Sequence, residues 1–522
     1  MDVRDRPWLD ADLPVLERVR LLLMQMTAAE KVGQLVQVAN IDAVGDADSL
    51  RQSRIGSSLA ASGATAGNIR DKGVSARNVA EVQSIAVGQS RLGIPLLFAR
   101  DVIHGHRTVF PIPLGQAASW DADLVQRAAR IAATEASATG VRWTFAPMVD
   151  ISHEPRWGRV AESFGEDPRL AGRLGAAAVR GFQGERLSDP TSVAACAKHF
   201  VGYGLAEGGR DYDEVNVGEI ALRNRQMRPF RAALEAGCAT VMSAFHTVDG
   251  VPMTANEHLL RGVLKQEWGF DGVVVSDWNA VEELLCHGVA TDRREAAELA
   301  LRAGVDVDMV SGAYGEFGAA ALADGGWSVA DLDDAVARVL ALKFRLGLFD
   351  AVPDDAAAVL GWSVPIPAEH LKLAREAAAA SFVLLANDGV LPLVAESLQR
   401  VLVTGPFADA TGELFGTWTL DGRDDDVASF GTVLTALLPE GVVEVDSSGF
   451  SDRTLTRARG ADVVIACVGE HPDRSGEANS VTSLNLPPGQ EQLLAALGDL
   501  GVPLVVVVFA GRPLVLDAVA SE

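Results

Sequence analysis

The chain has 522 residues, of which 48% are hydrophobic and 22% are charged, and its formal net charge at pH 7 is −25. This composition is typical of a soluble globular protein with enough material for two or more domains. The acidity argues against nucleic acid as a partner, because proteins contact phosphate backbones with Lys and Arg. A neutral or cationic ligand fits this charge better.

Neither the N-terminus nor the cysteines indicate a special compartment or a metal. Residues 1–8 contain no apolar signal core, and no stretch reaches the ~18–20 apolar residues of a membrane span. We therefore expect no membrane association and a cytoplasmic location, or a secreted or periplasmic one if a leader has been removed. The four cysteines lie in or beside apolar segments without metal-ligand spacing, so we expect buried free thiols, no metal and no cofactor. They are Cys196, Cys238, Cys286 and Cys467.

Eight apolar, β-rich runs alternate with helical patterns over residues 1–350. Eight such units in roughly 250–350 residues predict an α/β fold of the (β/α)8 TIM-like barrel type. The expected strands cover residues 35–39, 55–59, 94–98, 143–147, 193–196, 240–243, 273–275 and 305–309, and helices are expected at 13–26 and 328–349, among others.

Polar or aromatic residues follow six of these strands. Because the carboxyl ends of barrel strands meet at one face, we expect a pocket there. The clearest case is the run 273–275, which leads into Ser276, Asp277 and Trp278; Asp277 is either a catalytic residue or the cap of a helix beginning near Val281. Asp308 is interpreted as a helix cap. The other strand ends carry Asp101, Asp150, Lys198 with His199, and Phe245.

A second α/β unit follows the barrel. Residues 351–380 are expected to form a linker and a lead-in helix at 368–380, and residues 381–522 a sandwich domain. Its chain stops soon after the last expected strand, so we expect an incomplete domain whose sheet edge is either truncated or covered by a further chain or a second copy. Strands are expected at 382–385, 401–403, 463–466 and 504–509, and a helix at 490–497.

An ordered set of motifs resembles glycoside hydrolase family 3 of the β-glucosidase type. The resemblance implies a barrel followed by an α/β sandwich, with the active site at their junction. It also implies a retaining, exo-acting β-glucosidase that removes terminal β-D-glucosyl residues through a covalent glycosyl-enzyme intermediate. The motifs are Asp101-Val-Ile-His-Gly105, Phe110-Pro-Ile-Pro-Leu114, Glu154-Pro-Arg-Trp-Gly-Arg159 and its continuation to Pro168, Lys198-His199-Phe-Val-Gly-Tyr-Gly204, Gly209-Arg-Asp-Tyr212, Ser276-Asp277-Trp278, Gly304-Val-Asp-Val-Asp-Met309, Lys343-Phe-Arg-Leu-Gly-Leu-Phe349 and Val383-Leu-Leu-Ala-Asn387.

The same resemblance assigns roles to individual residues. The nucleophile falls on Asp277, and the acid/base falls on a second-domain loop that contains both Glu470 and Glu477. We favour Glu477, which lies further along the loop, with Glu470 as the alternative. Retention requires the two carboxyl groups to lie about 5–5.5 Å apart, which is met only if the domains dock. The sugar-binding positions are Asp101, Arg159, Lys198, His199, Met242 and Phe245, and Trp278 and Trp418 offer aromatic faces to a pyranose ring.

The sequence departs from the family pattern at two points. Ala386 replaces the usual Lys, and the second domain is shorter than in family members, which places its completeness in question. The alternative functions are a β-xylosidase or another exo-β-glycosidase of the family, and a catalytically silent sugar-binding protein. An N-acetylglucosaminidase is disfavoured because Asp211-Tyr-Asp213 lacks a His. A Schiff-base aldolase acting through Lys198 is a rival from another class.

Overall fold

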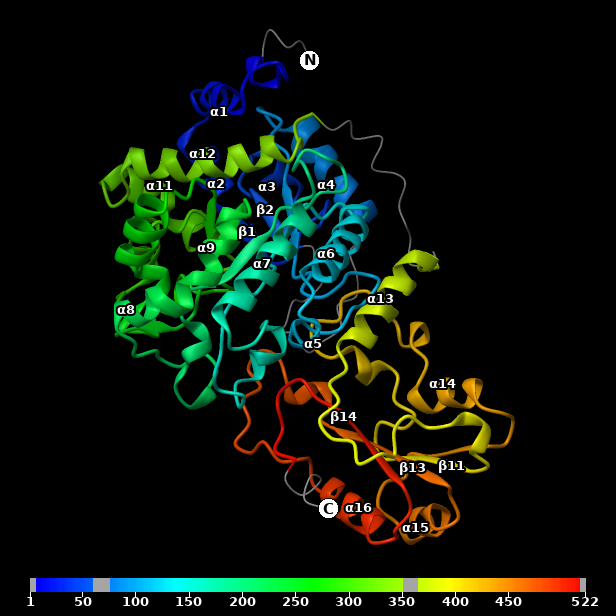
Figure 1. Cartoon of the computed structure of the whole chain (residues 1–522). Helices are drawn as coiled ribbons and strands as arrows, with labels where there is room; N and C mark the ends of the chain where they lie inside the picture. Colours follow the sequence, from blue (N-terminus) through cyan, green and yellow to red (C-terminus); the bar gives the residue numbers. More distant parts are fainter. Residues whose placement is uncertain (1–5, 60–75, 351–364, 517–522) are drawn as a thin grey trace.

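The computed structural model describes residues 6–59, 76–350 and 365–516, and they form two domains in chain order. Figure 1 shows the barrel coloured from blue to green and the second domain coloured from yellow to red, with helix α13 (Ala368–Ala380) lying between them. The predicted linker residues 351–364 lie outside the described residues. The predicted boundaries at 350 and 380 stay predictions.

Eight parallel strands close into the predicted barrel. Their hydrogen-bonded order is β10-β1-β2-β3-β4 in one sheet and β5-β6-β9 in another. Parallel bridges from Trp143 to Ala194 and from Val275 to Val307 join the two sheets into a ring. Each of the eight predicted strands overlaps an observed one, although the predicted run 193–196 shares only Cys196 with its strand. The barrel strands are β1 (Val36–Val38), β2 (Ser57–Leu59), β3 (Leu97–Arg100), β4 (Trp143–Thr144), β5 (Cys196–Phe200), β6 (Thr240–Ser243), β9 (Val273–Val275) and β10 (Asp308–Met309).

Helices cover the outside of this barrel, and several begin at residues that the sequence supplies as caps. The side chain of Asp167 accepts the N–H groups of Arg169 and Leu170, with Pro168 at the first helical position. The main helices are α1 (Val15–Leu23), α2 (Ala28–Gln34), α3 (Ala47–Arg51), α4 (Ala76–Gln89), α5 (Pro113–Ala118), α6 (Ala122–Ser137), α7 (Pro168–Gln183), α9 (Met227–Glu235), α10 (Arg293–Ala303), α11 (Ala313–Asp324) and α12 (Val329–Arg345).

The second domain is a four-stranded parallel sheet with helices on both faces, as predicted. The strand order is β12-β11-β13-β14. Residues of α14 pack on one face and residues of α15 and α16 on the other, so the sheet has two separate apolar cores. The elements are β11 (Val401–Thr404), β12 (Val443–Asp446), β13 (Val463–Gly469), β14 (Leu504–Phe509), α14 (Phe430–Leu437), α15 (Asp452–Ala458) and α16 (Gln490–Gly498).

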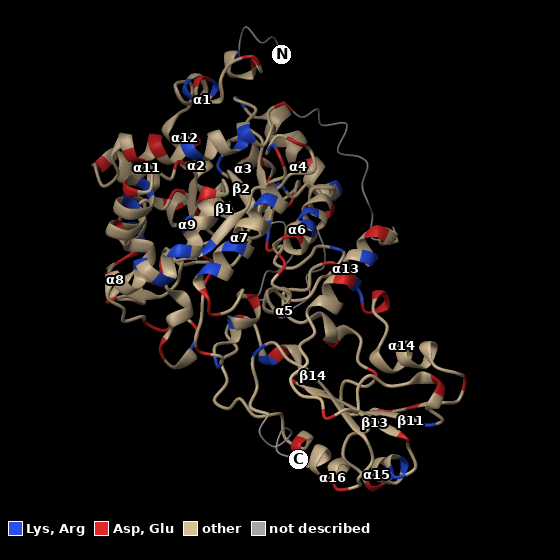
Figure 2. Ribbon diagram, in the orientation of Figure 1, with Lys and Arg blue, Asp and Glu red and all other residues tan. Residues whose placement is uncertain are grey.

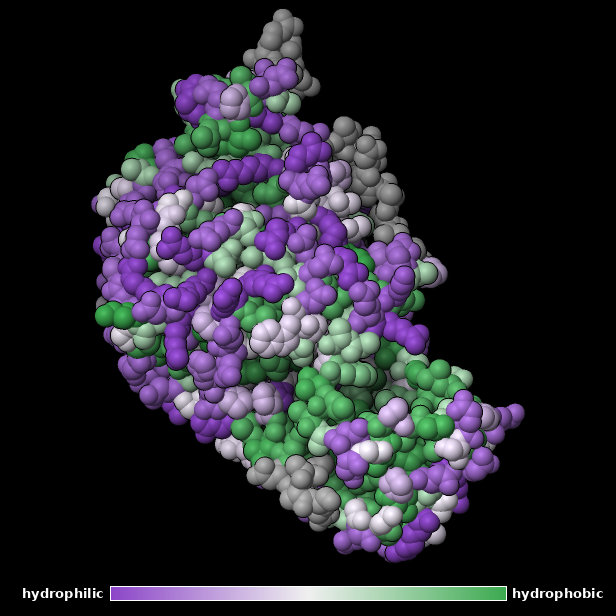
Figure 3. All heavy atoms as spheres, viewed as in Figure 1, coloured by the Kyte–Doolittle hydropathy of each residue, from purple (hydrophilic) through white to green (hydrophobic). Residues whose placement is uncertain are grey.

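One prediction about this domain is wrong, and one strand was not predicted. Residues 382–385 form no strand; their side chains, from Phe382 at 80% to Leu385 at 75%, are largely exposed. Apolar β-branched composition makes a strand only where a neighbour accepts its hydrogen bonds, and none of the described residues does so here. Strand β12 was missed, because its alternating Val-Glu-Val-Asp pattern is short. Figure 3 shows more apolar surface (green) over the second domain than over the barrel on this face.

Charged residues of both signs are mixed over the outer helices of the barrel in Figure 2, and the described Lys and Arg form no continuous patch in this view. Cys196, Cys238 and Cys467 are buried free thiols as predicted. Cys286 is exposed, so the prediction for that residue is wrong; it lies in a turn and not in a core strand. None of the described helices combines the length and apolar character that crossing a membrane requires.

Candidate active site

The carboxyl ends of the barrel strands bring the predicted polar residues together. Lys198 on β5 donates from Nζ to Asp101 Oδ1, which follows β3, at 2.8 Å. His199 Nδ1 lies 2.8 Å from Asp150 Oδ2, and its Nε2 lies 3.5 Å from Asp277 Oδ2. These residues come from four strands, so the fold alone creates this cluster.

Asp277 follows β9 and is nearly buried, with 7% of its surface exposed. Its Oδ1 accepts the N–H of the next residue, Trp278, at 2.7 Å. Its Oδ2 has no hydrogen-bond partner among the described residues. A helix cap would instead accept N–H groups two or three residues further on, so the geometry does not support the capping alternative. Asp308 lies in β10 and accepts the N–H of Tyr314 in the first turn of α11, but the N-cap residue of that helix is Gly312, so the interpretation of Asp308 as a helix cap is wrong.

A second-domain loop reaches this cluster and contributes Glu477. Tyr212 donates its hydroxyl to Glu477 Oε1 at 2.8 Å, and Glu477 Oε2 lies 3.8 Å from Arg159 Nη1. The backbone of the loop is also bonded to the barrel, since Gly476 N–H donates to the carbonyl of Gly158 at 2.7 Å. Glu477 is therefore held among barrel residues although it belongs to the other domain.

Gly158 makes this close approach of the two domains possible. A Cβ atom at this position would lie 2.2 Å from the carbonyl oxygen of Gly476 and 2.4 Å from that of Asn479. Both obstacles are backbone atoms, so any side chain at residue 158 would push the loop away. The loop that carries Glu477 depends on this glycine for its position.

Glu470, the alternative carboxylate, is engaged elsewhere. Its Oε1 accepts from Arg474 Nε at 2.8 Å and its Oε2 from Arg512 Nε at 3.0 Å. Arg512 in turn donates to the carbonyls of Pro155 and Arg156 on the barrel. Glu470 thus lies in a buried ion-pair network that joins the domains, and both of its oxygens are occupied.

Burial and nearby charges shift the pKa values of both Asp277 and Glu477. Burial and the charge of Glu477 raise the pKa of Asp277, against the opposing charges of Arg159 and Lys198. Burial also raises the pKa of Glu477, and the nearby carboxylates of Glu162 and Asp211 add to this. The pair therefore disfavours double ionisation and tends to hold one proton.

Arg159 is fixed by a carboxylate that the sequence interpretation missed. Glu162 pairs with it through two hydrogen bonds, at 2.9 Å to Nε and 3.1 Å to Nη2, within the 3-10 turn Gly158–Glu162. Both side chains are 1% exposed. The charges of Arg159 and Lys198 overcome the effect of burial and lower the pKa of Glu162. Arg159 and Glu162 are three residues apart, and this spacing places both side chains on one side of a 3-10 turn. The spacing could have predicted their pairing.

The predicted aromatic and sulfur positions lie at the same face. Met242 on β6 and Phe245 beyond it are buried, and Trp278 packs against the barrel core. The ring of Phe245 meets that of Tyr212 edge to face at 5.1 Å. Trp418 comes from the second domain, and its ring centre lies 5.1 Å from Lys198 Nζ, a cation–π contact. Eleven site residues were predicted, counting the alternative Glu470. The other ten therefore lie in or beside one cluster.

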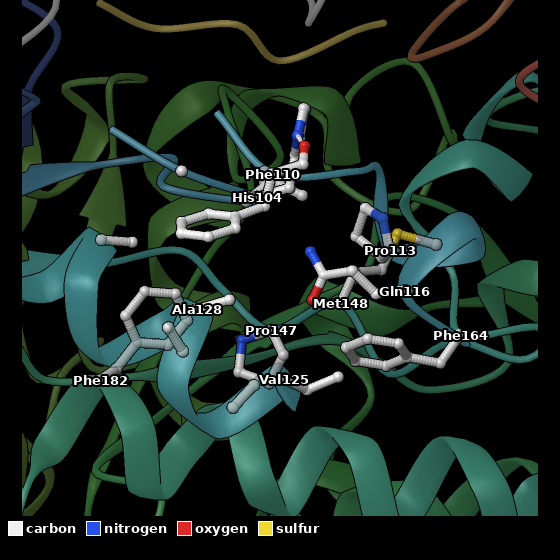
Figure 4. A pocket seen from close by; sticks show the side chains of 15 residues that line it. His104, Phe110, Pro113, Gln116, Val125, Ala128, Pro147, Met148, Phe164 and Phe182 are labelled. Carbon is white, nitrogen blue, oxygen red and sulfur yellow. Dashed lines mark hydrogen bonds between the residues drawn. The ribbon is translucent and has the colours of Figure 1, made fainter. Parts of the chain in front are cut away.

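A separate cavity lies between α5, α6 and α7, and Figure 4 shows it. It is lined mainly by apolar side chains such as Phe110, Val125 and Phe182, with His104 and Gln116 as polar members. None of the carboxylates described above lines it. Its mainly apolar lining sets it apart from the carboxylate cluster. Within the described parts of the chain, no three His, Cys, Asp or Glu side chains gather as a metal would require.

Both domains match known sequence families. The Glycosyl hydrolase family 3 N terminal domain matches residues 27–342, and the Glycosyl hydrolase family 3 C-terminal domain matches residues 382–522. Each match coincides with one of the two domains described above.

Individual relatives agree with these matches. The chain is 37% identical to the periplasmic beta-glucosidase of Salmonella typhimurium over 95% of this chain and 68% of that protein. It is 34% identical to a beta-xylosidase of Formosa agariphila, over 85% of this chain and 66% of that protein. The crystal structure of the beta-glucosidase from Listeria innocua with glucose superposes with a TM-score of 0.88 at 36% identity, covering 97% of this chain and 71% of that one. The chain thus spans about two thirds of the length of these relatives.

Proposed function

Since this chain belongs to glycoside hydrolase family 3, we propose that it is a retaining, exo-acting β-glucosidase that removes terminal, non-reducing β-D-glucosyl residues. The observation that carries this proposal is that Glu477 from the second domain lies against Arg159 and Tyr212 of the barrel, in the buried cluster that contains Asp277. A β-glucoside bond is cleaved with retention by two such carboxyl groups.

In the proposed mechanism, Asp277 Oδ2 attacks the anomeric carbon and forms an ester with the sugar. The bond to the leaving oxygen breaks as Glu477 gives that oxygen its proton. Glu477, now ionised, takes a proton from water, which attacks the anomeric carbon and releases Asp277 as a carboxylate. While Glu477 holds its proton, it exerts no repulsion on Asp277, and Arg159 and Lys198 favour the ionised nucleophile.

Asp101, Lys198, Arg159 and His199 are proposed to hold the sugar hydroxyl groups. Charged groups make the stronger hydrogen bonds, and the first three are charged. His199 differs from them, because burial and the charges of Arg159 and Lys198 keep its pKa well below the ordinary value. It is therefore a neutral imidazole, and its Nε2, which has no hydrogen-bond partner among the described residues, is available to a hydroxyl.

Lys198 does not suit a Schiff-base mechanism. Burial lowers its pKa, but the carboxylates of Asp101, Glu162 and Asp277 outweigh burial and raise it. An amine nucleophile must be deprotonated, so this ammonium group is a poor one. This argues for a sugar-binding role for Lys198 and against an aldolase.

The identity to the Formosa beta-xylosidase supports a second candidate, a β-xylosidase of the same family. The Listeria beta-glucosidase binds glucose, and a mutant of it binds laminaribiose, which favours the glucosidase. We expect the 4-nitrophenyl β-glucoside to show a higher kcat/KM than the β-xyloside and the N-acetyl-β-glucosaminide, with β-glucose as the first product in NMR spectra. A preference for the xyloside would reverse this choice, and glucose binding without hydrolysis of any substrate would indicate a sugar-binding protein.

Glu162 is expected to act through Arg159. Replacing Glu162 with Gln removes a buried charge-assisted pair, which is worth about 1.5–3 kcal/mol, or roughly 10- to 100-fold in binding. We expect inhibition by gluconolactone to weaken by this factor. Glu166→Gln is the matched control, because Glu166 is 74% exposed and pairs only with His153 in the described structure. Unchanged inhibition in Glu162→Gln would contradict the role.

Location and assembly are proposed separately. A cytoplasmic and a periplasmic location are the two alternatives, and the Salmonella relative is called periplasmic. Cell fractionation with an antibody against this protein distinguishes the two. Assembly with a second copy or a further chain is tested by light scattering coupled to size-exclusion chromatography.

A further inference from the structure

The loop that carries Glu477 is fastened to the barrel by one carboxylate, Asp211. Its Oδ2 accepts the backbone N–H of Ala478 at 2.8 Å. Its Oδ1 accepts from Trp157 Nε1 at 2.8 Å and from the hydroxyl of Tyr203 at 2.5 Å. Both of these rings are almost fully buried in the barrel. Asp211 therefore connects a rigid part of the barrel to the residue directly after Glu477.

The backbone around Ala478 explains why this contact matters. Ala478 has a φ of 61°, in the left-handed region that a residue with a side chain seldom adopts, so the loop needs support here. Ser480 supplies a second connection, because its hydroxyl donates to the carbonyl of Gly209 at 2.6 Å and accepts the N–H of Asp211 at 3.1 Å. Holding the N–H of Ala478 fixes the peptide plane that follows Glu477 and thereby limits the directions in which its side chain points.

On the basis of the proposed function, we propose that Asp211 is a positioning residue that aims Glu477 at the glycosidic oxygen. It contacts neither carboxyl group of the catalytic pair directly and acts through the Ala478 peptide. Its position in the chain fits this role, since Asp211 immediately precedes Tyr212, which donates to Glu477 Oε1. One barrel loop therefore holds both the backbone and the side chain of the acid/base.

Asp211 also contributes a negative charge near Glu477. Burial has the largest effect on the pKa of Glu477 and raises it. The charge of Arg159 lowers this pKa, and the carboxylates of Glu162 and Asp211 raise it. An acid that must donate a proton benefits from this, because it stays protonated to a higher pH. The charged or titratable groups that act on Glu477 or respond to it include Arg159, Glu162, Tyr203, Asp211, Tyr212, Asp277 and Glu283.

The test compares Asp211→Asn with Asp213→Asn as a matched control. Asp213 lies two residues away and pairs with Arg210 at the surface. Each variant is assayed on aryl β-glucosides whose leaving groups range from 2,4-dinitrophenol to phenol. A misdirected acid matters only where the leaving group needs a proton. We therefore expect the kcat/KM of Asp211→Asn to fall about 10- to 100-fold on the phenyl glucoside and to change little on the dinitrophenyl glucoside.

The pH profile provides a second readout. With the charge of Asp211 removed, the basic limb of kcat/KM is expected to move to lower pH, while Asp213→Asn keeps the profile of the unmodified protein. Ser480→Ala loosens the loop from the second-domain side without disturbing Trp157 or Tyr203. It should show the same leaving-group dependence, so the proposal can be tested even if Asp211→Asn folds poorly.

Equal losses on all leaving groups, or no loss at all, would overturn the positioning role while leaving the glucosidase proposal intact. The unmodified protein is assayed first. If it hydrolyses none of these glucosides, the proposed function fails, and the role of Asp211 fails with it.

Discussion

Replacing Asp277 with Asn is expected to lower kcat on aryl β-glucosides by on the order of 10⁴- to 10⁶-fold, as removal of a covalent nucleophile does in other hydrolases. The amide cannot form the glycosyl ester, and neighbouring Asp101 and Glu162 cannot replace it because they are already bonded to Lys198 and Arg159. The protein should still fold, because Asp277 Oδ2 supports no other described group.

Two measurements identify the role of Asp277 independently of rate. A 2-deoxy-2-fluoroglucoside should label the unmodified protein at Asp277, as peptide mapping would show. Azide should restore activity to Asp277→Ala and give an α-glucosyl azide, because azide then attacks from the face that the nucleophile has vacated. Asp271→Asn is the control, since Asp271 precedes the same strand and lies exposed beside Arg345. A label at another residue would refute the assignment.

The barrel could be predicted from the sequence because its strands are buried on both faces. Such strands are continuous apolar runs, and the residues that end them must lie at one face of a closed parallel sheet. Asp101, Lys198, His199 and Asp277 were placed together by this argument alone. The resemblance to a known family then added Arg159 and the second-domain loop.

The partners of these residues could not be predicted in the same way. The choice between Glu470 and Glu477 depends on their contacts. Glu470 pairs with arginines of its own domain, whereas Glu477 lies beside Arg159 of the barrel. Asp211 and Tyr212 are polar residues of a loop, and nothing in their spacing reveals that they contact residues more than 260 positions away. The bonds Lys198–His199 and Phe200–Val201 are cis, which is too rare without proline to be read from a sequence.

The second domain shows the limit of composition as a guide to strands. Residues 382–385 and 504–509 have similar apolar character, yet only the latter form a strand, because β13 lies beside them and pairs in parallel with Leu504 to Phe509. A strand is a property of a pair of segments, and the sequence of one segment does not show whether the other is in place.

Glu477→Gln and Glu470→Gln are expected to fail in different ways, because we propose that Glu477 donates a proton and that Glu470 supports the structure. The kcat/KM of Glu477→Gln should fall about 10²- to 10⁴-fold on glucosides with poor leaving groups and much less on the dinitrophenyl glucoside. Azide should rescue its turnover and yield a β-glucosyl azide, since the nucleophile is intact. Its melting temperature should change little, because only Tyr212 donates a hydrogen bond to the carboxylate of Glu477 in the described structure.

Glu470→Gln should instead lower stability. Glu470 and Arg512 are both fully buried, and Arg512 bridges to barrel carbonyls, so the substitution leaves a guanidinium without its counter-charge. Removing one partner of a buried pair costs about 3–5 kcal/mol, which denaturant unfolding would measure. Below its lowered melting temperature, the variant should keep the leaving-group dependence of the unmodified protein. If azide gave a β-glucosyl azide with Glu470→Gln and not with Glu477→Gln, the roles would be exchanged, and the acid would have to reach the sugar from between two arginines.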